Sequence, residues 1–190
     1  MTTTVLRAAD RIATPWKNGG GITREIAVWP SGAGLDDFEW RISMAEVHEA
    51  GAFSLFPGVD RCLAVIKGRL SLKLDGEVPV SLDAQSEPRT FPGDRACHGL
   101  PIGGSVLDLN VMSRRGLFRS EVKRVSNATW RPVGAVALLI ALESLAAVDD
   151  RASDQAIELG ALDGLLCCAP STQTALRIDG PALSIDITAL

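Results

Sequence analysis

The sequence has no tyrosine, only two histidines and no excess of positive charge. It has 19 lysines and arginines and 23 aspartates and glutamates, which gives a net charge of −4. Domains that bind nucleic acid carry a basic surface, so we expect no nucleic-acid partner. The longest apolar stretch, residues 133–142, is too short to span a bilayer, and the first 16 residues lack the apolar core of a signal peptide. We therefore expect a cytoplasmic chain with no membrane partner.

Metal and redox motifs are also missing. The four cysteines show no C-x-x-C spacing, which favours reduced thiols. A metal site usually needs three protein ligands, and His48 and His98 are the only histidines. A site built from His98, Cys97 and one carboxylate is the metal alternative that remains. No nucleophile elbow and no phosphate-binding Walker loop is present. We expect no metal and no cofactor.

Short alternating segments dominate what is present. The composition, with 46% hydrophobic and 22% charged residues, is that of a globular chain. Apolar and polar residues alternate over short runs that glycine and proline interrupt about every ten residues, which indicates an all-β barrel or sandwich. The predicted strands are 22–29, 38–47, 61–66, 69–74, 78–82, 106–112, 121–125 and 183–187. Residues 136–142 fit either a strand or a buried helix. The polar-face pattern stops near residue 126, which predicts two regions, 1–126 and 127–190.

Four polar residues interrupt otherwise apolar strand patterns: Arg41, Arg61, Asp108 and Asn110. An unpaired charge inside a closed sheet costs several kcal/mol, roughly 3–5, so such residues need partners. One interpretation is structural, with arginine–aspartate pairs inside or on a solvated face. The other is a polar ligand pocket in which arginine binds a carboxylate through two hydrogen bonds.

A glycine-rich segment, residues 15–21, precedes the first long strand. Proline followed by Asn-Gly-Gly indicates a turn, and the three glycines let the backbone take positive φ or approach another group closely. A tight turn and an anion-binding nest both fit this segment. In the strand that follows, alternation places Ile22, Ile26 and Val28 on one face.

Several motifs, in one order from Pro15 to Gly116, resemble the HutD/Ves family. They are PWKNGGGITREI at 15–26, WRISMA at 40–45, FSLFPGVDR at 53–61, and DLNVM at 108–112 followed by RRG at 114–116. The resemblance implies a cupin fold, the double-stranded β-helix, built as two fused cupin-like halves with a smaller C-terminal half. It also implies a link to histidine utilisation, with binding of an N-formylglutamate-like carboxylate and a regulatory role.

Comparison with metal-binding cupins sharpens this expectation. Their first motif, H-x-H-x3-E-x6-G, places Leu55 and Pro57 at its histidines and Arg61 at its glutamate. The second motif, P-x-G-x-x-H, begins at Phe91 and places Ala96 at its histidine. All four ligand positions are lost, and an arginine replaces an acid. The resemblance therefore implies a metal-free pocket for a small carboxylate.

These observations give a set of candidate ligand-binding residues and no catalytic residue. We expect Arg61 and Arg41 to bind the carboxylate, with Asp108 and Asn110 orienting it or holding the arginines. The rest of the set is Trp16, Lys17 and Asn18 at the rim, Gly19 and Gly20 at a close approach, and Thr23 and Glu25 as weaker candidates. Two alternatives stay open. One is an enzyme that uses Lys17, Glu25 or Asp108 as acid or base. The other is a structural protein that forms a homodimer through its outer sheet.

Overall fold

A computed structural model describes residues 2–16, 19–149, 156–170 and 174–190. Strands make up nearly all of the regular structure, and the one helical element in these ranges is a 3-10 turn, η1 (Ala8–Asp10). Among the described residues no helix is long and apolar enough to cross a membrane. The chain divides into two compact units: a central unit, Ile12–Phe118, and a terminal unit, Met1–Arg11 with Arg119–Leu190. The all-β prediction is confirmed.

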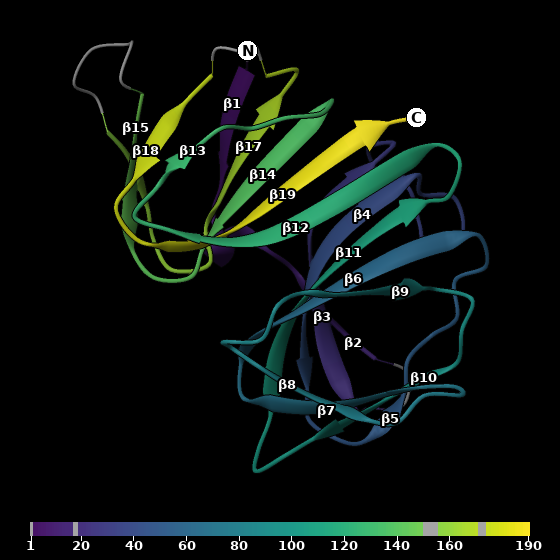
Figure 1. Cartoon of the computed structure of the whole chain (residues 1–190). Coiled ribbons are helices and arrows are strands. Elements are labelled where there is room, and N and C mark those ends of the chain that lie inside the picture. The colour runs from purple at the N-terminus through teal and green to yellow at the C-terminus, as the bar shows by residue number, and fades with distance from the viewer. Residues whose placement is uncertain (1, 17–18, 150–155, 171–173) are drawn as a thin grey trace. The chain divides into compact units, whose positions relative to one another are not determined.

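The central unit consists of two antiparallel sheets (Figure 1). The six-stranded sheet has the order β2 (Ala13–Pro15), β3 (Gly21–Trp29), β4 (Trp40–Val47), β11 (Val106–Arg114), β6 (Val59–Lys67), β9 (Arg89–Pro92). The four-stranded sheet has the order β5 (Gly51–Ala52), β10 (Cys97–Pro101), β7 (Arg69–Leu74), β8 (Val80–Asp83). Leu63 and Val65 of the larger sheet pack with Leu70 and Leu72 of the smaller one, so this face of the larger sheet points into the unit.

The terminal unit also consists of two sheets. The five-stranded sheet has the order β1 (Thr2–Leu6), β17 (Gly164–Cys168), β14 (Val136–Ala141), β19 (Pro181–Ala189), β12 (Phe118–Ser126). The four-stranded sheet has the order β13 (Thr129–Trp130), β18 (Leu176–Ile178), β15 (Leu145–Asp149), β16 (Ile157–Leu159). Residues 136–142, which the sequence left open between strand and helix, contain the strand β14.

The two units share one topology. In the central unit the order β4–β11–β6–β9 faces β5–β10–β7–β8, and in the terminal unit β12–β19–β14–β17 faces β13–β18–β15–β16. Each strand of the second set comes eight strands after its counterpart. The extra strands differ: β3 and β2 extend the central sheet beyond β4, whereas β1 extends the terminal sheet beyond β17. The chain thus contains the same arrangement of strands twice.

The division between the units differs from the boundary expected at residues 126–127. The structure places it at Phe118 and Arg119, because nearly all of β12 belongs to the terminal unit, in whose sheet it lies beside β19. The first eleven residues also belong to the terminal unit, because β1 pairs with β17, with Thr4 opposite Leu166.

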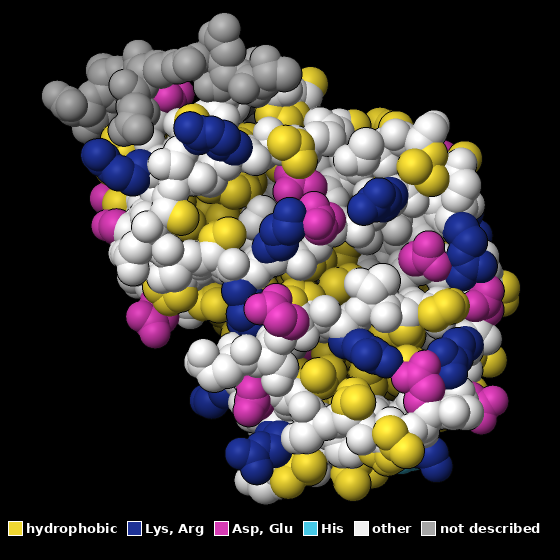
Figure 2. Space-filling view, viewed as in Figure 1, with side chains coloured by type: hydrophobic (Ala, Val, Ile, Leu, Met, Phe, Trp, Pro, Cys, Tyr) yellow, Lys and Arg dark blue, Asp and Glu magenta, His cyan; other side chains and the backbone are white. Residues whose placement is uncertain are grey.

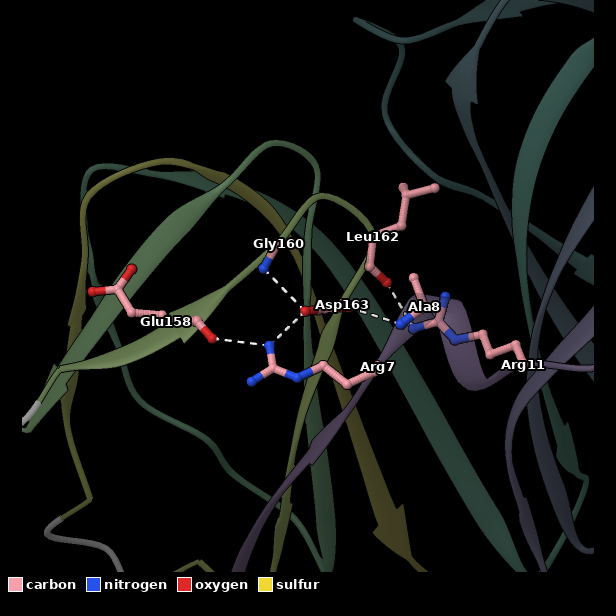
Figure 3. Close-up of polar contacts among 7 residues, drawn as sticks. All are labelled: Arg7, Ala8, Arg11, Glu158, Gly160, Leu162 and Asp163. Carbon is pink, nitrogen blue, oxygen red and sulfur yellow. Dashed lines mark hydrogen bonds and ion pairs between the residues drawn. The ribbon is translucent and has the colours of Figure 1, made fainter.

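Asp163 fixes this N-terminal segment (Figure 3). Its carboxylate accepts hydrogen bonds from the Arg7 guanidinium at 2.7 Å, the Ala8 amide at 2.7 Å and the Gly160 amide at 3.0 Å. Burial raises the pKa of Asp163, but the bonds from Ala8, Arg7 and Gly160 outweigh it and the pKa lies below its ordinary value. Arg11 donates to the Leu162 carbonyl at 2.6 Å. The turn before β17 therefore holds both ends of η1.

An irregularity in the predicted strand at residues 22–29 changes the face on which its later residues lie. The register of β3 with β4 shifts between Glu25 and Ala27, so an extra residue there breaks the alternation. After the bulge Val28 lies opposite Arg41, on the face that carries Thr23 and Glu25. The expectation that Val28 shares a face with Ile22 is therefore wrong, because a bulge is not visible in the alternation of side chains.

Candidate functional site

A polar band crosses the inward face of the central unit's six-stranded sheet. Directly opposed residues share a face, and Ser43 lies opposite both Glu25 and Asn110. One pair further along, Ala45 lies opposite Thr23 and Asp108. In the other direction Met112 lies opposite both Arg41 and Arg61. The register thus brings six of the sequence-predicted residues to one face: Thr23, Glu25, Arg41, Arg61, Asp108 and Asn110.

Apolar clusters border the band on both sides. One contains Leu63, Val65 and Phe91 together with the leucines of β7 and β8. The other contains Phe38, Val59 and Met112. Arg61, Asp108 and Asn110 of the band are therefore shielded from water, which strengthens their electrostatic interactions and makes unpartnered polar atoms costly.

Arg61 is the charged residue at the centre of the band, and only 6% of it is exposed. Its Nη2 donates to Asn110 Oδ1 at 2.7 Å and its Nη1 to the Ser54 carbonyl at 3.2 Å. Its Nε is buried and has no hydrogen-bond partner. Burial lowers the pKa of Arg61, against the opposing effects of Cys97 and Asp108. An arginine remains protonated in proteins even so, and a fixed positive charge therefore lies inside the unit.

Three phenyl rings surround this guanidinium. Its carbon lies 5.5 Å from the ring centre of Phe53, 5.6 Å from that of Phe56 and 5.3 Å from that of Phe91. Rings at such distances stabilise the cation and restrict where another group can reach it. Sequence reasoning did not single out these rings as site residues, although Phe53 and Phe56 lie within the motif at 53–61.

Asp108 ends the hydrogen-bonded chain that begins at Arg61. The side chain of Asn110 donates to Asp108 Oδ1 at 2.5 Å, so its amide bridges the arginine and the acid. Asp108 is fully buried, and its Oδ2 has no hydrogen-bond partner. Burial raises the pKa of Asp108 to about 7, although Arg61 and the Asn110 bond act to lower it. The carboxyl is therefore only partly ionised near neutral pH.

Several other arginines of the central unit pair with carboxylates, whereas Arg114 donates to the Phe38 and Asp36 carbonyls. Arg24 pairs with Glu46. Arg89 and Arg95 both pair with Glu77, and both of these distances are 2.7 Å. Arg115 lies 2.8 Å from Asp60 and 3.1 Å from Asp94. Charges of both signs lie side by side on the surface in view (Figure 2). Among the described residues no carboxylate comes within ion-pair distance of Arg61, and no other arginine of that part of the chain is buried.

Arg41 is held differently from Arg61. Its Nε lies 2.8 Å from Glu25 Oε2, and its Nη1 donates to Ser43 Oγ at 3.2 Å. The Glu25 side chain is 43% exposed, and that of Arg41 is 12% exposed. The pair is therefore internally neutralised and lies at the wetter side of the band.

Trp16 and the glycine segment lie beside the band. The Trp16 indole donates to Thr23 Oγ1 at 2.7 Å and meets Phe53 edge-on, with ring centres 6.4 Å apart. A Cβ at Gly21 would lie 2.5 Å from the Glu46 carbonyl and 3.1 Å from the Trp16 ring, so glycine is required there. Gly19, at φ +74°, donates its amide to the Trp16 carbonyl at 3.0 Å. Lys17 and Asn18 lie outside the described residues.

The ungapped cupin-motif alignment is wrong at its flanks. Leu55, Pro57 and Ala96 are all exposed, so none of them faces the interior. Cys97, one residue beyond Ala96, is the buried residue there, and its charge interaction with Arg61 places it beside the site. A shift of one residue along a strand exchanges inner and outer positions. Burial raises the pKa of the Cys97 thiol to about 11, which keeps it protonated. Within the described ranges no three His, Cys, Asp or Glu side chains gather where they could hold a metal ion.

Paired antiparallel sheets that enclose an interior, present twice in one chain, define this protein as a two-unit cupin. Oxalate decarboxylase of Bacillus subtilis, in its S161A mutant, shares the fold with a TM-score of 0.62 over 97% of this chain and 76% of that one. At 9% identity this likeness concerns the fold alone. The expected cupin fold with two fused halves is confirmed.

The chain belongs to the HutD family, whose model matches residues 8–183. HutD from Pseudomonas fluorescens SBW25, in a structure described as its formate condition, is 28% identical with a TM-score of 0.87, and each chain is covered completely. An uncharacterized 21.2 kDa protein in the hutC 3' region of Pseudomonas putida is 37% identical over 63% of this chain. Protein Ves of Citrobacter koseri is 37% identical, also over 63% of this chain. The matches span 62% of the length of each of these two curated relatives.

Proposed function

We propose that the central unit binds a small carboxylate without a metal, and that it does so as a binding protein and not as an enzyme. The observation that carries this proposal is Arg61: a buried guanidinium with a free Nε–H and no carboxylate partner among the described residues. A buried charge without a directly bonded counter-ion costs several kcal/mol, roughly 3–5, and a bound carboxylate supplies that direct partner.

The surrounding residues support an orienting role. Asn110 holds one edge of the Arg61 guanidinium, and the Ser54 carbonyl holds Nη1. The direction of the Nε–H is therefore fixed before a ligand arrives, which lowers the entropy lost on binding. In this proposal Arg61 is the principal carboxylate-binding residue, Asp108 and Asn110 set its position, and Arg41 contributes from the Glu25 pair. Trp16 and Thr23 form the rim, together with Gly19 and Gly20.

The relatives point to the metabolic setting. One is described by its place in a hutC 3' region and another by the name HutD, from which we infer a role linked to histidine utilisation. The ligand we propose is an N-formylglutamate-like carboxylate, and the role is regulatory. Formate, named in the condition of the Pseudomonas fluorescens structure, is the smallest member of the same chemical class.

A thermal-shift panel tests the proposal. It contains formate, glutamate, urocanate and N-formylglutamate, with divalent metals as a separate arm. A ligand at about 100 times its Kd stabilises the protein by roughly 2.7 kcal/mol, or about 5–10 °C for a chain of this size. We expect such a shift with at least one carboxylate and none with metal alone.

Two variants make the test specific to Arg61. Arg61→Met removes the buried charge but keeps an apolar side chain of similar length, and we expect it to lose the ligand-induced shift. Arg95→Met removes an arginine that pairs with Glu77 and should keep the shift. An equal shift in Arg61→Met and the wild type would overturn the assignment. No shift with any carboxylate would favour a structural, dimer-forming protein.

One observation favours a second candidate function. The pKa of Asp108, raised to about 7, lies in the range that suits a general acid or base. An enzyme that acts on the same carboxylate through Asp108 would convert it over time. Proton NMR of N-formylglutamate incubated with the protein separates the two: unchanged ligand signals support binding alone. A product that the wild type forms and Asp108→Asn does not form would establish the enzyme.

A further inference from the structure

The charges inside the central unit do not balance when Asp108 is protonated. The groups that face the interior beside Asp108 are Arg61 from β6, Arg41 from β4, Glu25 from β3 and Cys97 from β10. Arg41 and Glu25 neutralise each other as an ion pair, and Cys97 is an uncharged thiol at neutral pH. Strands β7 and β8 contribute the buried leucines Leu70, Leu72, Leu74 and Leu82. One fixed positive charge, that of Arg61, therefore faces one titratable acid, Asp108.

The side chain of Asn110 is hydrogen-bonded to both of these groups. Its carbonyl oxygen accepts from Arg61 and its amide nitrogen donates to Asp108. The guanidinium and the carboxyl are therefore linked through one side chain and make no direct contact. Each of them keeps one buried polar atom without a partner, Nε on Arg61 and Oδ2 on Asp108. An ionised Asp108 and a bound carboxylate would both be stabilised by the one positive charge of Arg61. The two negative charges would repel each other strongly in a shielded interior.

We propose that the central unit takes up its carboxylate together with one proton, which goes to Asp108. This rests on the proposed function, because it requires a carboxylate near Arg61. In the free protein the Asp108 carboxylate offsets the charge of Arg61. On binding, the ligand carboxylate takes over that role, a proton from solvent joins Asp108, and the net charge of the site is unchanged.

The coupling gives a defined pH dependence. Protonated Asp108 favours the anion, so affinity is highest below the pKa of Asp108 in the free protein and falls as the pH rises above it. With complete coupling the Kd rises about tenfold per pH unit on the alkaline side of pH 7. Small carboxylates are fully ionised over this range, so their own titration contributes nothing.

Isothermal titration calorimetry with formate and with N-formylglutamate tests this. The Kd is measured from pH 6.0 to 8.5 for the wild type, Asp108→Asn and Asp186→Asn. Asp186 is a buried acid of the terminal unit whose pKa is also raised by burial, which makes it the matched control. We expect a rising Kd in the wild type and in Asp186→Asn. In Asp108→Asn we expect a Kd that does not change with pH, whatever its value.

A second measurement needs no variant. At pH 7.5 to 8.0 the binding heat in Tris and in HEPES, which differ in ionisation enthalpy, gives the number of protons taken up, and we expect a value approaching one. Binding with no proton uptake and a constant Kd would overturn this inference but leave the proposed function standing. Binding that strengthens with pH would also overturn it. No binding of either probe at any pH would instead remove the proposed function itself.

Discussion

The two units have the same strand topology but fill their interiors differently. Strand β6 of the central unit directs Val59, Arg61, Leu63 and Val65 inward, and the corresponding strand β14 directs Ala137, Leu139 and Ala141 into the apolar core of the terminal unit. The polar side chains on the inward face of β19 have partners: the Trp130 indole donates to Ser184 Oγ at 2.9 Å, and the Val133 amide donates to Asp186 Oδ1 at 2.8 Å. The difference suggests that one copy of the fold supports binding and the other supports stability.

The largest expected effect comes from the apolar interior of the terminal unit. Leu139 is fully buried, so Leu139→Ala should lower the free energy of unfolding by about 2–5 kcal/mol, through lost burial and the cavity left behind. Urea unfolding measures the loss. Val133→Ala, at a position 55% exposed, should change stability by less than about 0.5 kcal/mol.

The same variant checks the division of roles. At a temperature where Leu139→Ala remains folded, its Kd for formate should equal that of the wild type. A Kd that changes tenfold would show that the terminal interior takes part in binding, and the contrast between the units would fail.

An effect of similar total size, spread over a defined pH window, is expected from the polar interior. The folded-state pKa of Asp108 is about 7, above the value of about 3.9 in an unfolded chain. The folded state therefore binds the proton more tightly, and this contribution to stability is complete below about pH 4 and lost as the pH rises through 7. Between these limits the wild type should lose about 1.4 kcal/mol per pH unit relative to Asp108→Asn.

Urea unfolding of both proteins from pH 4 to 8.5, without ligand, measures this difference. It should level off above about pH 8, because Asp108 is then ionised in both states. Parallel curves for the two proteins across the whole range would show that Asp108 titrates normally, and the electrostatic contrast between the interiors would be lost.

Local sequence patterns predict the long strands and the face on which the polar band lies. Arg61, Asp108 and Asn110 meet because each occupies an inward position of a regular strand, and alternation alone identifies such positions. Alternation did not reveal the bulge after Glu25, which moves Val28 to the other face. It also did not show that Cys97, and not Ala96, points inward, because the motif was placed by residue count without a strand.

Long-range pairing was beyond what the sequence indicates. Strand β1 pairs with β17 across about 160 residues, and nothing in Thr2–Leu6 specifies that partner. The strands β16 and β18 have three residues each, too few for a periodic pattern. The rings around Arg61 come from separate segments, and only the fold brings Phe91 to Phe53 and Phe56.

The smallest effect should come from Asp163 of the terminal unit, whose pKa is shifted in the opposite direction to that of Asp108. Its carboxylate has three hydrogen-bond donors, and its pKa is lowered, the reverse of the shift at Asp108. The contribution to stability is therefore present above the unfolded pKa of about 3.9 and lost as the pH falls below it. Asp163→Asn keeps an acceptor but removes the charge, so at pH 7 it should lower the free energy of unfolding by about 1 kcal/mol, and the deficit should shrink toward pH 3.

Because Asp163 fixes η1 and the end of β1, limited proteolysis should also cut Asp163→Asn near residue 11 faster than Asp108→Asn. A deficit that grows on acidification would contradict the assignment of an ionised, fully bonded carboxylate here and would remove the contrast with Asp108.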